Sequence, residues 1–247
     1  MTERNLGFIR LGSSQTVNAF FPGALVTQTD TYAFRTGSVA ANVAISTSAS
    51  GGSGVFALAL FRDNDASGTL NVGDTFLPPG DNSIGSFHSL NRVLSQGNYI
   101  ARAQTFSGTD TPYTFRIARA STGGANPLTT PEIQLGTIEQ DLTKRGSISN
   151  DNSADNYAFS LDQGDRLNIK VKELGNLSGD VNIRVVRDLD ADGIVDRNEI
   201  LVKGTSTVQG NIDALSVGGR GDYLLQICQG QGNVRYTADF DLVTANQ

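Results

Sequence analysis

The chain has no tryptophan, one histidine and one cysteine among its 247 residues. A single cysteine, Cys228, excludes an intrachain disulfide. One histidine, His88, and one cysteine cannot fill the four-ligand shell of a structural zinc site. A disulfide scaffold and a His/Cys zinc module are therefore excluded by count.

Long apolar runs are also missing. No stretch approaches the roughly 20 apolar residues needed to span a membrane, and the opening segment MTERNLGFIR lacks the apolar core of a secretory signal. The formal net charge is −6 and the pI is about 4.7, so the chain gains nothing from the phosphate attraction that dominates nucleic-acid affinity. We expect neither a membrane span nor a nucleic-acid partner.

What the sequence does contain is an internal repeat. Four blocks recur in the same order at offsets of about 125 residues: 9–12 with 133–136, 30–34 with 155–159, 62–74 with 187–199, and 97–99 with 221–223. Between the copies, residues 120–132 are rich in Gly, Pro, Ser and Thr and indicate a linker. The repeat predicts two domains, 1–122 and 130–247.

The local pattern within each copy is typical of β-strands. Tyr32 and Phe34 alternate with polar neighbours, as do Tyr157 and Phe159. Residues 55–61, 98–103, 166–172 and 181–186 are further strand-like runs, and Gly, Asn, Asp and Ser cluster between them. No segment of ten or more residues shows a convincing helical period. We therefore predict an all-β chain made of two tandem β-sandwich (jelly-roll-like) domains.

The segment 188–199 has the ligand spacing of an EF-hand calcium loop, with oxygen donors at positions 1, 3, 5, 7, 9 and 12 and glycine at position 6. Its flanks, VNIRVV and ILVKGTSTV, predict strands rather than the helices of an EF-hand. Val195, at position 8, is expected to point into the core. The predicted metal ligands of this second loop are Asp188, Asp190, Asp192, Ile194 (through its carbonyl), Asp196 and Glu199.

A matching loop occupies 63–74 in the first copy, with Gly68 at position 6 and Leu70 at position 8. Asp74, at position 12, is one carbon shorter than glutamate. Five acids stand at ligand positions of the second loop and three at those of the first, so we expect the second loop to bind calcium more tightly. The predicted ligands of the first loop are Asp63, Asp65, Ser67, Thr69 (through its carbonyl), Asn71 and Asp74.

The two loops predict about two bound Ca²⁺ ions, one per domain. The alternative is a pair of solvated acidic turns, because Asp and Gly also favour ordinary turns. Five correctly spaced acids, together with a second loop in register, favour calcium. Without flanking helices, a calmodulin-like opening switch is not expected, so the ion is predicted to be structural.

Each copy resembles the bacterial pre-peptidase C-terminal domain, often called PPC. The resemblance rests on an early Leu-Gly, a D-x-Y-x-F strand, the central strand that leads into the Asp-rich loop, a late G-x-Y and a closing strand with a tyrosine: Asp30, Tyr32, Phe34, Gly97, Tyr99 and Tyr113 in the first copy, and Asp155, Tyr157, Phe159, Gly221, Tyr223 and Tyr236 in the second. It implies a compact, non-catalytic β-sandwich attached to secreted bacterial enzymes, and therefore an extracellular or cell-surface location.

Catalysis is not expected. His88 has no equivalent in the second copy and is expected at a surface or edge position, although a glycosidase-type pair of carboxylates is not excluded by counting. The main prediction is an accessory module in which calcium is structural. One alternative is calcium-dependent adhesion to a polysaccharide or a collagen-like or other protein ligand; another is a fragment of a secreted peptidase. The six tyrosines match in pairs across the copies and are expected in the core.

Overall fold

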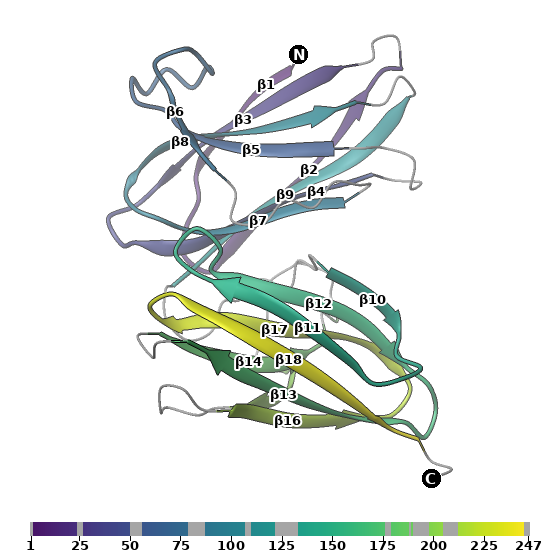
Figure 1. The fold of residues 1–247 in the computed structure, drawn as a ribbon. Helices are drawn as coiled ribbons and strands as arrows, with labels where there is room; N and C mark the ends of the chain where they lie inside the picture. The colour runs from purple at the N-terminus through teal and green to yellow at the C-terminus, as the bar shows by residue number, and fades with distance from the viewer. Residues whose placement is uncertain are drawn as a thin grey trace. The chain divides into compact units, whose positions relative to one another are not determined.

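The computed structural model describes residues 2–23, 27–49, 56–78, 87–106, 110–121, 133–175, 179–187, 189, 198–204 and 212–244. The chain divides into two compact units, residues 1–121 and 122–247. Figure 1 shows two stacked sheets within each unit. Within the described residues, no helix is long and apolar enough to cross a membrane.

The first unit contains a five-stranded sheet in the order β1-β3-β8-β5-β6 and a four-stranded sheet in the order β2-β9-β4-β7. The edge strand β1 pairs with β3 in parallel, and the other pairings among the described strands of this unit are antiparallel. The strands are β1 (Thr2–Phe8), β2 (Ser13–Phe21), β3 (Gln28–Thr36), β4 (Ala41–Ala49), β5 (Phe56–Arg62), β6 (Thr75–Leu77), β7 (Phe87–Leu94), β8 (Gly97–Thr105) and β9 (Thr111–Ser121).

The second unit repeats this arrangement with sheets β10-β12-β17-β14-β15 and β11-β18-β13-β16. Again the first strand, β10, pairs in parallel with the next strand of its sheet, β12. The strands are β10 (Ile133–Thr137), β11 (Leu142–Ile148), β12 (Ala154–Leu161), β13 (Arg166–Leu174), β14 (Asp180–Val186), β15 (Ile200–Gly204), β16 (Ile212–Gly218), β17 (Gly221–Gln231) and β18 (Val234–Val243).

Each core lies between the two sheets of its unit. In the first unit, alternate residues such as Tyr32 and Phe34 on β3 face Val43 and Ile45 on β4, and the second unit forms an equivalent cluster from its own two sheets. Every second residue of a strand lies in the core because successive side chains point to opposite faces of the sheet. The prediction of an all-β chain with two β-sandwich domains is confirmed.

The paired tyrosines form the same buried network in both units. The Tyr32 and Tyr113 hydroxyls lie 2.7 Å apart, and the Tyr113 hydroxyl donates to Asp30 Oδ2 at 2.7 Å. In the second unit the Tyr157 and Tyr236 hydroxyls are again 2.7 Å apart, and Tyr236 donates to Asp155 Oδ2. Burial raises the pKa of Tyr32 to about 12. The D-x-Y motif and the closing tyrosine are therefore halves of one internal contact.

The G-x-Y tyrosines have a second repeated role. The Tyr99 hydroxyl donates to the carbonyl of Ser95 at 2.9 Å, and the Tyr223 hydroxyl donates to the carbonyl of Gly219 at 2.7 Å. Both bonds reach back four residues and fix the turn before a core strand, as in the tyrosine corner of other sandwiches. All six tyrosines are buried, which confirms that they belong to the interior.

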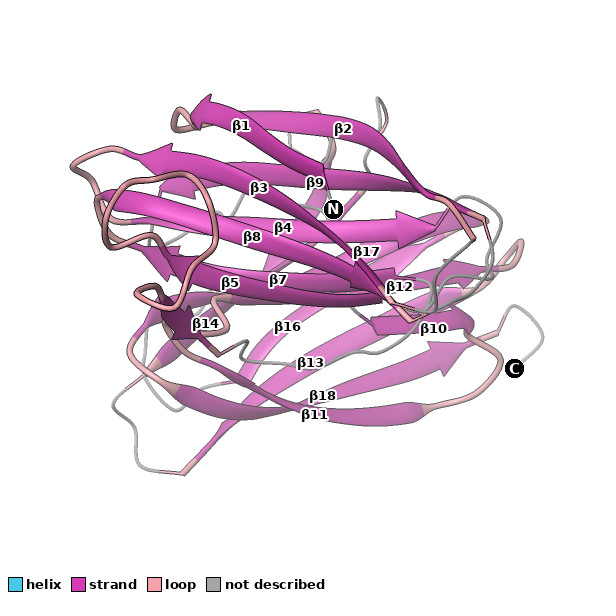
Figure 2. Ribbon diagram, turned by 90° about the horizontal axis from the view of Figure 1, so that it is seen from above, coloured by secondary structure: helices cyan, strands magenta, loops and turns pink. Residues whose placement is uncertain are grey.

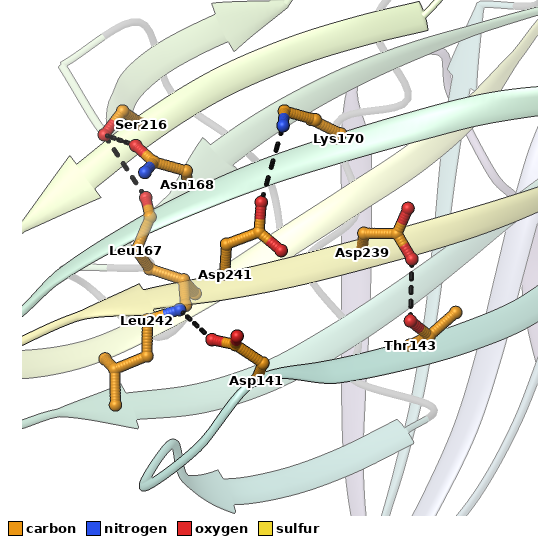
Figure 3. Close-up of polar contacts among 9 residues, drawn as sticks. All are labelled: Asp141, Thr143, Leu167, Asn168, Lys170, Ser216, Asp239, Asp241 and Leu242. Atoms are coloured by element: carbon orange, nitrogen blue, oxygen red, sulfur yellow. Dashed lines mark hydrogen bonds and ion pairs between the residues drawn. The ribbon is translucent and has the colours of Figure 1, made fainter.

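The outer face of the β11-β18-β13-β16 sheet is polar (Figure 3). Thr143 donates to Asp239 at 2.7 Å, and the half-exposed Lys170 lies 3.5 Å from Asp241. Short polar contacts between neighbouring strands of this kind contribute a few tenths of a kcal/mol each. The face is a solvated surface, and its contacts need no ligand to explain them.

His88 differs from its expected surface position. The expected edge position is confirmed, because His88 lies on the edge strand β7. The expected surface exposure is wrong, because its side chain is only 2% exposed. It pairs across the strands with Thr47, which is also buried. Burial lowers the pKa of His88 to about 4. The sequence suggested a surface site because the short apolar pattern around His88 does not show which side of an edge strand faces the core.

Candidate metal site

The first loop, 63–74, connects β5 to β6, so strands flank it as predicted. It folds back over the outer face of its own sheet (Figure 2). A Cβ atom on Gly68 would lie 3.8 Å from the Cβ of Ala33 on β3, and the Thr69 hydroxyl donates to Glu3 on β1 at 3.4 Å. The loop is therefore packed against the outside of the sandwich, on strands β1 and β3.

Its sharp turn depends on two residues with positive φ. Gly68, at position 6, has φ of 73°, as the loop pattern requires, and Ala66 has φ of 58°. The left-handed region disfavours a residue with a Cβ, but here the turn directs backbone N–H groups toward Asp63. Ser67 N donates to Asp63 Oδ1 at 3.1 Å, and Gly68 N donates to Asp63 Oδ2 at 2.9 Å. These bonds hold the buried position-1 carboxylate in place.

Three of the predicted ligand side chains converge. Asp63, Asp65 and Asp74 each have a carboxylate oxygen within 4.8 Å of the others. Asp63 is buried, Asp74 is half-buried and Asp65 is exposed, so the cluster opens to solvent on one side. Hydrogen bonds from Ser67, through its hydroxyl and its N–H, hold the pKa of Asp65 below its usual range. Asp65 therefore keeps its charge at neutral pH.

The Asn71 amide nitrogen lies where several oxygens meet. Its Nδ2 is 3.1 Å from Asp65 Oδ2, 3.4 Å from Ser67 Oγ and 3.2 Å from the Thr69 carbonyl oxygen. All three oxygens were predicted to ligate the ion. They surround one donor group, which carries partial positive charge. The loop thus brings together the neutral and charged oxygens at positions 3, 5 and 7.

Asp74 closes the loop with both of its oxygens. Asn64 N donates to Oδ1 at 3.2 Å, and Asn71 N donates to Oδ2 at 2.9 Å. The shorter aspartate side chain therefore reaches the loop at position 12. Leu70, at position 8, is only half-buried and is not among the residues of the core. The first loop is anchored on the outer sheet face by Gly68 and Thr69.

Most of the second loop, namely Asp188, Asp190, Asp192, Ile194, Val195 and Asp196, lies outside the described residues. Glu199 is described, and it is 2% exposed. Leu189 N donates to Glu199 Oε1 at 2.6 Å, which matches the bond from Asn64 N to Asp74 in the first loop. In both loops the position-12 carboxylate therefore binds the N–H of position 2.

Two features of the site were not predicted. Glu3, on β1, lies beside the first loop although it stands 60 residues before Asp63, and no local pattern connects them. The Asn71 amide was predicted as an oxygen ligand, but its Oδ1 accepts from Gly73 N at 2.8 Å while its nitrogen faces the other ligands. The residue types were evident in the sequence, whereas the direction of the amide depends on the loop's folding.

No family model matches the chain, and no curated protein matches it. Among solved structures, the pre-peptidase C-terminal domain of a collagenase from Bacillus anthracis is similar at 16% identity and a TM-score of 0.35, over 49% of this chain and 100% of that one.

The Aeromonas hydrophila protein PliG, a periplasmic inhibitor of g-type lysozyme, is similar at 14% identity and a TM-score of 0.29, over 45% of this chain and 98% of that one. The tandem CBM22 domains of Paenibacillus barcinonensis Xyn10C are similar at 10% identity and a TM-score of 0.24, over 86% and 82%. All three scores lie below 0.5, so these likenesses assign neither a family nor a function.

Proposed function

We propose that this chain is a non-catalytic pair of β-sandwich modules, each held by one structural Ca²⁺ ion. The observation that carries the proposal is the first loop, where Asp63, Asp65 and Asp74 converge and further oxygens face the same point. Calcium takes six to eight oxygens at roughly 2.3–2.6 Å. Six predicted ligands at EF-type spacing meet that requirement.

Binding at the first loop requires a local change at Asn71. An amide nitrogen cannot ligate a cation, so the side chain must rotate to present Oδ1, giving up the bond from Gly73 N, or must yield its place to water. Position 9 of such loops often acts through water. The oxygens of Asp65, Ser67 and Thr69 already face the position of the Asn71 amide nitrogen. The ion would then replace an internal hydrogen-bond network with stronger charge pairing.

An accessory role, outside the cell or on its surface, follows from the resemblance to pre-peptidase C-terminal domains and from the availability of calcium there. Domain assignments of 1–122 and 130–247 to that family belong to the same proposal. We propose no catalytic role, because the acids that cluster among the described residues are assigned as calcium ligands in this proposal. A role as part of a secreted peptidase is the alternative within this proposal, and it rests on the resemblance alone.

Calorimetric titration of calcium into the full chain tests the proposal. We expect two sites, of which the tighter is lost in Asp188→Ala and the weaker in Asp63→Ala. Glu139→Ala, which removes an exposed acid outside both loops, is the control and should bind as the unaltered chain does. Tighter binding at the first loop would overturn the ranking, and no heat from either loop would overturn the metal assignment.

Chelator tests the structural role separately. A ligand that binds only the folded state stabilises it by about 2.7 kcal/mol at a concentration 100 times its Kd. We therefore expect excess chelator to lower the melting temperature of the unaltered chain by several degrees and to have less effect on Asp63→Ala. An identical melting curve with and without chelator would show that any bound calcium is not structural.

A further inference from the structure

An arginine and two phenylalanines line up on the outer face of the first unit's five-stranded sheet. The Arg102 guanidinium on β8 lies 5.2 Å from the ring centroid of Phe61 on β5. The Phe61 ring lies 5.4 Å from that of Phe76 on β6. We call these three residues the Arg102 row. Phe76 is 50% exposed, and Arg102 and Phe61 are half-buried.

Arg102 lacks a counter-ion. Within the described part of the chain no carboxylate pairs with it, and its buried Nε has no hydrogen-bond partner. The hydroxyl of Thr31, directly opposite on β3, also lacks a partner. A guanidinium stacked on a ring keeps its N–H edges free to bind a carboxylate in a bidentate manner. The row is thus a cation with unused donors beside exposed aromatic surface.

The equivalent positions of the second unit bond to one another, although the buried Asn156 Nδ2 has no hydrogen-bond partner within the described residues. By strand register, Asn156, Gln226 and Arg184 correspond to Thr31, Arg102 and Ala59. There Arg184 donates to Gln226 Oε1, and Gln226 Nε2 donates to Asn156 Oδ1 at 2.8 Å. Val186 and Ile200 face each other on β14 and β15, where the first unit has two phenylalanines. The arginine beside two phenylalanine rings at these positions is therefore particular to the first unit.

We propose that the Arg102 row binds a carboxylate-bearing polysaccharide. The cation would bind a uronate carboxylate, and Phe76 would contact the apolar face of a sugar ring. Nucleic-acid affinity depends on several cationic contacts to phosphates, whereas the row offers one cation, enough for one uronate carboxylate. Addition of a peptide strand at this edge would have to use β6, whose three residues offer few backbone bonds. A glycan can instead use the side-chain face.

The proposal is independent of the metal site. Because Asp63, Asp65 and Asp74 lie in the loop beside β6, their charge opposes an anionic ligand when no cation is bound. Titrations are therefore run both in saturating calcium and in excess chelator, which separates failure of the Arg102 row from failure of the loop. Binding through the row predicts an effect of Arg102 in calcium whether or not the loop proves to hold the ion.

The experiment compares a glucuronate-containing hexasaccharide with the same sugar after reduction of its carboxyl groups. For the full chain we expect the reduced sugar to bind about tenfold more weakly, as loss of one charged hydrogen-bonded pair predicts. Arg102→Gln should weaken binding of the acidic sugar to a similar extent and abolish its advantage over the reduced sugar. Phe76→Ala should weaken both sugars alike.

Arg35→Gln is the matched control, since it removes one exposed positive charge from β3 of the same sheet. It should change the affinity less than twofold. No binding of the acidic sugar to the unaltered chain in calcium overturns the proposal, and so does an equal loss in Arg35→Gln and Arg102→Gln. Binding of a hexaglutamate peptide as tight as that of the sugar would assign the row to acidic peptides and overturn the polysaccharide assignment.

Discussion

On the outer face of the five-stranded sheet, Arg102 and Thr31 of the first unit make no hydrogen bond to each other, whereas Gln226 of the second unit donates to Asn156 Oδ1 and, of the described atoms of that pair, only Asn156 Nδ2 is left unpartnered. Inside, the two units are nearly the same: each closes an Asp–Tyr–Tyr network between its sheets. Interior contacts constrain both copies alike because buried polar groups must stay paired. The copies differ instead on the outer face, although Thr31, Asn156 and Gln226 are buried there too.

The largest expected difference between the units is a response to pH, because the only histidine lies in the first. Burial lowers the pKa of His88 to about 4, from an ordinary value of 6.5. The folded state therefore binds fewer protons than the unfolded state between these values, and stability is lost as pH falls from 6.5 to 4. The shift is equivalent to on the order of 3 kcal/mol.

Chemical denaturation at pH 7 and pH 4, followed by circular dichroism, measures this loss. His88→Leu should remove the contribution of histidine protonation to this loss. The variant should therefore lose less stability than the unaltered chain over the same pH range. Both proteins also protonate carboxylates in this range, and the comparison cancels that contribution. Equal losses in the two proteins would show that His88 is accessible to protons in the folded state.

The shared interior gives the next effect. Tyr113→Phe and Tyr236→Phe each remove a hydroxyl that serves both an aspartate and a second tyrosine. Leaving these buried groups unpaired should cost about 1–3 kcal/mol in either unit. Denaturation monitored by circular dichroism measures both variants. Similar losses support equivalent networks; a loss below about 0.5 kcal/mol in one unit would show that its network is replaced by water.

The smallest effect concerns the two loops. Asp74→Glu gives the first loop the position-12 residue of the second. A longer carboxylate can reach an ion with both oxygens, so we expect calcium affinity at the first loop to rise about tenfold, or about 1.4 kcal/mol. Titration in an Asp188→Ala background isolates the first loop. Unchanged affinity would mean that the neutral ligands Ser67 and Asn71, rather than Asp74, limit binding.

Much of the fold could be predicted from the repeat and the alternation of apolar residues. Strands β5, β8, β13 and β14 lie within one or two residues of the predicted runs, because half-buried strands must alternate. The burial of His88 was missed, since a polar residue on an edge strand carries no sign of which face it occupies. Leu70, at position 8 of the first loop, lies outside the core because the loop folds back over the outer face.

The sequence by itself indicated two repeated units, their strand-rich interior and the oxygen-bearing residues at the proposed ligand positions of the first loop. These depend on local patterns that repeat at a fixed offset. Only the tertiary structure decided that Asp30 meets Tyr113 across the sheets, that Glu3 lies beside Thr69, and that Arg102 stands unpaired beside Phe61. Contacts of this kind join strands distant in sequence, so their geometry follows from sheet pairing and register.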